Sequence, residues 1–209
     1  MLLSSWFSNT VEKVDRKTGK LVATLTEFAA PVDALEFVDG SLYVAELASG
    51  NLVKVSPDGK TRSIVAKELR GPVAMAQGPG SLVYVTEIAG GAVLQIDVAT
   101  GARRVVADGL AGPEGIDVGP DGRLFVLDWN RLRQVTAEGE VTTLPGEGFN
   151  ALAVAGTKKI DLGGSTMNLR AENNNENFRT GRINFITFQD LDVVRYRVPG
   201  VEQVTPLMQ

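Results

Sequence analysis

The chain has 209 residues, of which 44% are hydrophobic and 22% are charged, as is usual for a globular protein with a substantial core. Its 21 basic and 25 acidic residues give a net charge of −4 without long charge runs, which argues against nucleic-acid binding. The absence of cysteine and histidine excludes disulfides, thiolate nucleophiles, cysteine-based metal sites and a Ser-His-Asp triad.

Nothing in the sequence predicts a membrane span or a secretion signal. No apolar run approaches the length that crosses a bilayer. The opening MLLSSWFSNT lacks a charged n-region and a long apolar stretch, so we expect no signal peptide. A chain without cysteine suits either redox environment, so the compartment stays open, and an extracytoplasmic one fits if the natural protein begins further upstream.

In chain order, the first predicted elements are three short strands in residues 1–30. The stretch LLSSWFSNTVEKVDRKTGKLVATL contains three β-rich segments with turn residues between them. Its pattern matches the second, third and fourth strands of the unit that follows, so this first unit is partial.

Residues 31–71 predict four antiparallel strands. An apolar stretch at 31–38 is followed by an Asp39-Gly40 turn and by a second strand in SLYVAEL. A third strand in NLVKV and a fourth in TRSIVAKEL flank the turn Pro57-Asp58-Gly59. No apolar spacing near 3.6 residues occurs, which excludes a helical solenoid.

The unit repeats with a period of 41 residues. Three independent features keep this spacing: the proline that opens the unit, an aromatic residue in its second strand, and an acid at the end of that strand. They are Pro31, Pro72 and Pro113; Tyr43, Tyr84 and Phe125; and Glu46, Glu87 and Asp128. Four strands in a period of this length are typical of one blade of a β-propeller.

The whole chain is predicted to be one all-β propeller domain of about five four-stranded blades in an incomplete ring. The predicted blades are 1–30 (partial), 31–71, 72–112, 113–148 and 149–209. The last begins with FNALAVAG, contains an irregular, Asn-rich insertion at 157–180, and resumes the pattern in residues 181–207. A fragment of a longer protein is favoured over an unusual closure, for example by pairing with a second copy.

The phrase GPEGIDVGPDGRLFVLDW (112–129), with its relatives at 31–47 and 72–88, resembles the repeats of NHL-repeat and gluconolactonase-like propellers. It is also similar to the streptogramin-lyase repeat. The resemblance covers residues 1–150 well and 181–207 more weakly. It implies a ring of six or more blades, but it is weak evidence for any reaction, because propellers have many functions.

The repeat acids Glu46, Glu87 and Asp128 have two interpretations. Carboxylates on neighbouring blades could converge on a divalent cation, because Ca²⁺ takes several oxygen ligands. Alternatively, each acid accepts hydrogen bonds from the adjacent loop. The repetition favours this structural role, because a ligand site requires asymmetry.

Glu114 and Asn150 are the candidate metal ligands. The resemblance implies that their positions line the mouth of the central channel, where they can ligate a metal such as calcium. The corresponding Val32 and Val73 cannot ligate, so only two oxygen ligands are available. A turn that merely caps the strand is the favoured alternative.

Trp6 and Trp129 close the second strands of two blades and are the candidate ligand-binding residues. The alternative, that they cover gaps between blades, is favoured. The sequence contains no phosphate-binding glycine loop, zinc helix or nucleophile elbow.

We expect a propeller that binds a small molecule or a protein at its blade loops, without catalysis of its own. The alternative is a metal-dependent lactonase, hydrolase or lyase of the gluconolactonase or streptogramin-lyase type. The lyase chemistry that the resemblance implies relies on a histidine, which this chain lacks. An interaction domain of a larger protein is a third interpretation. The unpaired edge of the first blade predicts self-association.

Overall fold

The computed structural model describes residues 1–15, 17–129 and 131–144, and within them it contains strands and no helix. No helix in this part of the chain is long and apolar enough to cross a membrane. The fifth predicted unit, 149–209, with its insertion 157–180, lies outside the described residues. The strands are β1 (Leu2–Ser5), β2 (Thr10–Val14), β3 (Leu21–Leu25), β4 (Pro31–Glu36), β5 (Leu42–Glu46), β6 (Asn51–Val55), β7 (Arg62–Ala66), β8 (Pro72–Gln77), β9 (Leu82–Glu87), β10 (Ala92–Asp97), β11 (Arg103–Ala107), β12 (Pro113–Val118), β13 (Leu124–Asp128), β14 (Arg131–Val135) and β15 (Val141–Thr143).

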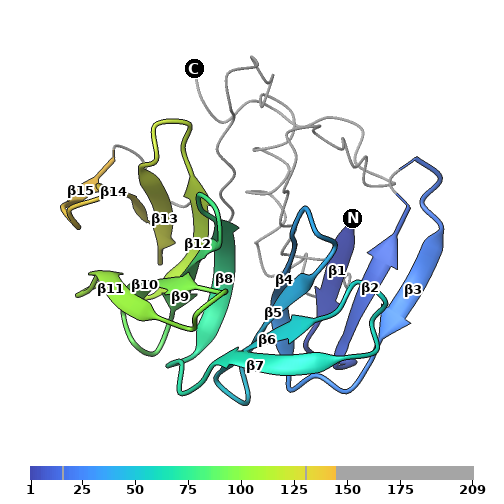
Figure 1. The fold of residues 1–209 in the computed structure, drawn as a ribbon. Helices are drawn as coiled ribbons and strands as arrows, with labels where there is room; N and C mark the ends of the chain where they lie inside the picture. The colour runs from blue at the N-terminus through green and yellow to red at the C-terminus, as the bar shows by residue number, and fades with distance from the viewer. Residues whose placement is uncertain (16, 130, 145–209) are drawn as a thin grey trace, which may run out of the picture.

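The strands form four antiparallel sheets, each made of strands consecutive in sequence. Strands β1–β3 form the first sheet, β4–β7 the second, β8–β11 the third and β12–β15 the fourth. The prediction of an all-β fold with four-stranded antiparallel sheets is therefore confirmed. Figure 1 shows the sheets fanned around a common centre, with β4, β8 and β12 near the centre and β3, β7, β11 and β15 outermost. The four described sheets alone do not close a ring.

The hydrophobic core lies between neighbouring sheets. One cluster joins the first two sheets, a second joins the middle two, and a third joins the last two. Both faces of the second and third sheets are therefore covered, so their middle strands β5, β6, β9 and β10 are mostly buried on both faces rather than alternating. In β5, all five residues from Leu42 to Glu46 are buried.

Each innermost strand carries a β-bulge next to its first residue. In β4, Pro31 pairs with Glu46 and Asp33 pairs with Ala45, which leaves Val32 as an extra residue. The same irregularity in β12 makes Glu114 the extra residue, and β8 is irregular between Pro72 and Met75. A bulge changes the direction in which its side chain points, so it can re-aim a residue.

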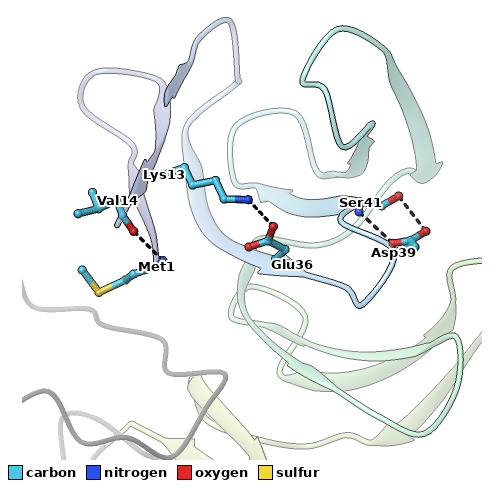
Figure 2. Close-up of polar contacts among 6 residues, drawn as sticks. All are labelled: Met1, Lys13, Val14, Glu36, Asp39 and Ser41. Atoms are coloured by element: carbon cyan, nitrogen blue, oxygen red, sulfur yellow. Dashed lines mark hydrogen bonds and ion pairs between the residues drawn. The ribbon is translucent and has the colours of Figure 1, made fainter. Parts of the chain in front are cut away.

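Polar contacts also link neighbouring sheets. Buried Asp33 of β4 accepts a 2.7 Å hydrogen bond from the backbone N–H of Met75 in β8. Lys13 of β2 forms an ion pair with Glu36 of β4, and Figure 2 shows the lysine extending across to it. Phe28 lies in the connection that precedes β4. The guanidinium of Arg62 in β7 lies over its ring, 4.2 Å from the ring centroid.

Several turns contain an aspartate that accepts hydrogen bonds from its own turn. Asp39 accepts bonds from the backbone N–H and the hydroxyl of Ser41 at 2.9 and 3.0 Å (Figure 2). These bonds favour the ionised carboxylate and lower the pKa of Asp39. Hydrogen bonds within the turn lower the pKa in the same way at Asp15, Asp58 and Asp121. The pKa of Asp97 is also lowered, mainly by a hydrogen bond from the Ser81 hydroxyl just before β9.

Candidate functional site

One end of the sheets, which we call the top end, carries the turns after β1, β5, β9 and β13 and the connections into β4, β8 and β12. Leu69 lies in the connection between β7 and β8, and its N–H donates to the carbonyl of Gly50, in the turn after β5, at 2.8 Å. Gly50 has a φ of +65°, and a Cβ there would lie 2.6 Å from the Leu69 oxygen, so only glycine fits. Turn and connection are therefore held together within each sheet.

The three repeat acids are buried at the top end, where their carboxylates accept backbone hydrogen bonds. Glu46 accepts from the Ala29 N–H at 3.0 Å, and Glu87 from the Arg70 N–H at 2.7 Å. Asp128 accepts from the Gly112 N–H at 2.8 Å. Each donor lies one or two residues before the first strand of the same sheet. These contacts support the structural interpretation, because one carboxylate oxygen of each acid is already used.

The second carboxylate oxygens have different surroundings. Glu46 Oε2 accepts a 2.6 Å hydrogen bond from the Ser49 hydroxyl. Asp128 Oδ2 accepts a 3.0 Å bond from Arg133 Nε, in an ion pair that is almost completely buried on the aspartate side. The equivalent of Ser49 in the third sheet is Gly90, which has no side chain to donate.

Glu114 is the bulged residue of β12 and is half-buried. Burial raises the pKa of the Glu114 carboxyl, because the charged form loses solvation. Its equivalent in the second sheet, Val32, packs against the core between the second and third sheets.

Asn150, the other predicted ligand, lies outside the described residues. Within the described part of the chain, no group of three acidic residues is close enough to hold a metal ion. The described residues therefore do not provide a donor set for a metal, and the pairing of Glu114 with Asn150 stays a prediction.

Trp6 and Trp129 are both exposed at the top end, with 51% and 64% of their surface accessible. They occupy the position that Leu47 and Ile88 fill in the middle sheets, where the side chains are half-buried. Trp129 has a φ of +58° and lies against Gly112, where a Cβ would be 3.1 Å from the indole. This contact also fits the packing alternative.

The two tryptophans lie on the first and the fourth sheet, and their described contacts differ. Trp6 makes an edge-on contact with Phe7, with ring centroids 5.0 Å apart, and Phe7 itself is exposed. The structure thus places both at one end without bringing them into contact within the described residues.

Sequence reasoning missed one feature of the third sheet. Arg70 stands where the neighbouring repeats have Ala29 and Ala111, and Gly90 stands where the second sheet has Ser49. Aligning the connections and turns of the three repeats, rather than only their strands, would have revealed both departures.

Comparison with known structures identifies the fold. A chain in the crystal structure of a nidogen/laminin complex matches with a TM-score of 0.62 and 18% identity, over 72% of this chain and 64% of that chain. This protein is a β-propeller. The propeller also matches virginiamycin B lyase from Staphylococcus aureus, with a TM-score of 0.57 and 20% identity, over 68% of this chain and 54% of the lyase.

A gluconolactonase from Xanthomonas campestris matches the propeller with a TM-score of 0.59 and 18% identity, over 70% of this chain and 59% of the enzyme. The chain therefore spans between about half and two thirds of these structures. The family model for the N-terminal part of strictosidine synthase-like proteins matches residues 100–126. None of the curated proteins matches the sequence. The predicted resemblance to gluconolactonase-like and streptogramin-lyase-like propellers is confirmed at the level of the fold.

Proposed function

We propose that this propeller is a binding module that holds a small molecule or a protein at its top end and performs no chemistry of its own. The observation that supports it most is the variation at one repeat position. Leu47 and Ile88 are half-buried there, whereas Trp6 and Trp129 are exposed. Exposed tryptophans are frequent at recognition surfaces, because a large rigid ring supplies contact area at little entropic cost.

The repeat acids support the same proposal. Glu46, Glu87 and Asp128 each hold the connection that leads into their own sheet, so they stabilise the loops that would present the binding surface. Loops supported by a rigid scaffold are a common arrangement for binding. The nidogen/laminin match adds the example of a protein complex that contains a chain of similar fold.

The experiment uses Trp6 and Trp129, the only two tryptophans of the chain, as fluorescence reporters. The purified protein is titrated with a peptide library and with a set of sugar lactones. We expect at least one probe to change the emission saturably. The response should be lost in Trp6→Leu or Trp129→Ile, which introduce the aliphatic side chains of the neighbouring repeats, while the unfolding midpoint stays the same. If no probe gives a saturable response, the proposal is wrong.

A metal-dependent lactonase is the second candidate, and the observation that favours it is Glu114 on its bulge with a raised pKa. Its test is hydrolysis of gluconolactone with and without added Ca²⁺. If the protein hydrolyses gluconolactone only with Ca²⁺ and Glu114→Gln abolishes this turnover, the protein is an enzyme and the binding-module proposal is wrong. We expect turnover at background and no heat of Ca²⁺ binding in either version.

A further inference from the structure

The sequence contains four Asp-Gly pairs, at 39–40, 58–59, 108–109 and 121–122. In such a pair the backbone nitrogen of the glycine can attack the side-chain carbonyl of the aspartate, because glycine has no side chain that hinders the approach. All four aspartates are exposed, so exposure does not distinguish them. Their hydrogen bonds do.

Three of the pairs lie in tight turns that hold both reacting groups. Asp39, Asp58 and Asp121 each accept a hydrogen bond from the backbone N–H two residues further on, at 2.9, 3.1 and 3.1 Å. The N–H of the glycine that follows each aspartate donates to a backbone carbonyl of the same turn, at 2.8, 2.8 and 2.9 Å. Hydrogen bonds within these turns also lower the pKa of the three carboxyls, which keeps them in the charged form that resists attack.

The fourth pair, Asp108 and Gly109, lies in the connection between β11 and β12. No described residue donates a hydrogen bond to the Asp108 carboxylate, and none accepts one from the Gly109 N–H. A Cβ built on Gly109 would have no atom within 4 Å, so the space beside the glycine is open. Among the described residues, nothing therefore holds the two groups of this pair apart.

The main chain at Asp108 also lacks a contact that the two earlier connections have. In the second and third sheets, an arginine of the outermost strand donates to this part of the preceding connection. Arg103 donates to the Lys67 carbonyl at 2.6 Å, and Lys67 lies 41 residues before Asp108, at the equivalent position. By the strand register, the fourth sheet has Val141 at the position of Arg103, and valine has no side-chain donor. The backbone of this pair is therefore less restrained than its equivalents.

We propose that Asp108-Gly109 is a modification site, where the folded chain rearranges spontaneously to isoaspartate while the other three pairs stay intact, and that this change loosens the connection into β12. The inference is independent of the proposed binding function, because it concerns only the chemistry of the chain itself.

The rearrangement has two steps. The Gly109 nitrogen forms a bond to Cγ of Asp108, and the carboxyl OH leaves with the amide proton as water, which gives a five-membered succinimide ring. Water then opens the ring. If the bond between the Gly109 nitrogen and the main-chain carbonyl carbon of Asp108 breaks, the product is isoaspartate, whereas breakage of the new bond restores aspartate. The water that is lost is regained, so the change needs no oxidant, reductant or cofactor.

Isoaspartate lengthens the main chain by one atom between two anchored residues. On one side, Ala107 pairs with Val93 in the third sheet. On the other, the Leu110 N–H donates to the Gly91 carbonyl at 2.9 Å, and the Leu110 side chain is buried in the core between the third and fourth sheets. We expect the longer main chain to weaken the Leu110 hydrogen bond, so that the Leu110 amide exchanges its hydrogen faster.

The experiment incubates the purified, folded chain in water enriched in the heavy isotope of oxygen, because each ring opening adds one oxygen from water. Proteolysis after basic residues and glutamates gives peptide 105–114, which contains Asp108, and peptide 115–123, which contains Asp121. We expect mass spectrometry to find heavy oxygen and a second chromatographic form in 105–114, and neither in the peptides of the other three pairs. A sample unfolded in urea should take up heavy oxygen at all four pairs, because the turns no longer hold them.

Gly109→Glu is the matched blocking variant. Gly109 has a φ of +69°, and the equivalent residues Glu27 and Glu68 have φ values of +65° and +58°, so glutamate fits this backbone. Its side chain hinders attack by the backbone nitrogen, so the heavy oxygen at Asp108 should be lost. If the variant fails to fold, the comparison of the four pairs in the parent protein still decides the result.

Three outcomes would overturn the inference: equal heavy oxygen at all four pairs of the folded protein, heavy oxygen at Asp108 only in urea, or heavy oxygen at Asp108 that a folded Gly109→Glu does not reduce. Hydrogen exchange of the separated isoaspartate form tests the loosening of the connection. An unchanged exchange rate of the Leu110 amide would overturn that part.

Discussion

The first sheet and the two middle sheets have the same strand pattern but different burial. Val14 of β2 and Val55 of β6 occupy equivalent positions, 41 residues apart, yet only Val55 is completely buried. The second sheet has neighbours on both faces, whereas no described element covers the face of the first sheet that carries Val14. The burial of a side chain in a propeller is therefore set by the adjacent blade as much as by its own strand.

The outermost strands show the same contrast. Arg62 of β7 donates to the carbonyls of Thr26 and Glu27 and lies over Phe28 of the preceding connection. Arg103 of β11 likewise donates to the carbonyl of Lys67 at 2.6 Å. The equivalent residue of β3 is Leu21, which is 58% exposed. The first sheet thus has an apolar residue where the second and third sheets have an arginine that contacts the connection leading out of the preceding sheet.

The largest expected difference in stability between the sheets is at the repeat acid that ends the second strand. Asp128→Ala removes the acceptor for the Gly112 N–H and leaves Arg133 without its ion pair, so it should lower the free energy of unfolding by about 3 kcal/mol. In the first sheet, Ser5→Ala at the same position should change it by at most about 0.5 kcal/mol. Urea unfolding of both variants measures the difference. Equal losses would show that the acids do not hold the connections.

A matched pair of valines tests the burial contrast directly. Val55→Ala creates a cavity between the first two sheets and should lower the free energy of unfolding by about 2 kcal/mol. Val14→Ala should lower it by less than about 1 kcal/mol, because Val14 is only partly buried. The measurement is again urea unfolding, followed by tryptophan emission. A loss at Val14 as large as at Val55 would mean that something covers the first sheet in solution.

The open side of the first sheet predicts self-association. Among the described residues β1 pairs only with β2, which leaves one strand edge available, and exposed edges favour pairing with other chains. Leu3 is only partly buried, although its equivalents Val44 and Val85 are completely buried. Leu3→Lys should therefore reduce the self-association seen by light scattering at tens of micromolar protein. A monodisperse, monomeric parent protein would contradict this prediction.

The smallest expected effect is on pH dependence and concerns the turns that the repeats share. The pKa of Asp39, Asp58 and Asp121 is lowered by hydrogen bonds within their turns. The unfolded chain therefore takes up protons first, and the stabilisation present above the ordinary aspartate pKa of about 4 is lost as the pH falls further. Replacing all three with asparagine should flatten the acid side of the stability curve.

Glu114→Gln is the control for the pH dependence of stability, because the pKa of Glu114 is shifted in the opposite direction from that of the aspartates. Burial raises the pKa of Glu114, so its ionisation opposes folding, and the loss of stability occurs as the pH rises through the raised value. Glu114→Gln should remove this loss of stability at rising pH. It should not change the loss of stability at falling pH that comes from the three aspartates. If the acid branch changes in Glu114→Gln but not in the asparagine variant, the assignment of these groups is wrong.

The sequence alone predicted the fold through features that every repeat must keep. Pro31, Pro72 and Pro113 open the innermost strands, and the acids at Glu46, Glu87 and Asp128 end the second strands, so a period of 41 residues is visible without any structure. The predicted strands differ only at their ends. For example, β7 ends at Ala66, because the Leu69 N–H already donates to the turn at Gly50.

Only the tertiary structure decided what the top end offers. The sequence could not show that Glu114 stands on a bulge, since a bulge depends on the pairing of two strands. Nor could it show which donors reach the second carboxylate oxygen of each repeat acid. Ser49 donates to Glu46 and Arg133 donates to Asp128, whereas Gly90, beside Glu87, has no side chain that could donate. A repeat fixes which residue types recur, but the contacts between blades, turns and connections determine which of their atoms remain available to a ligand.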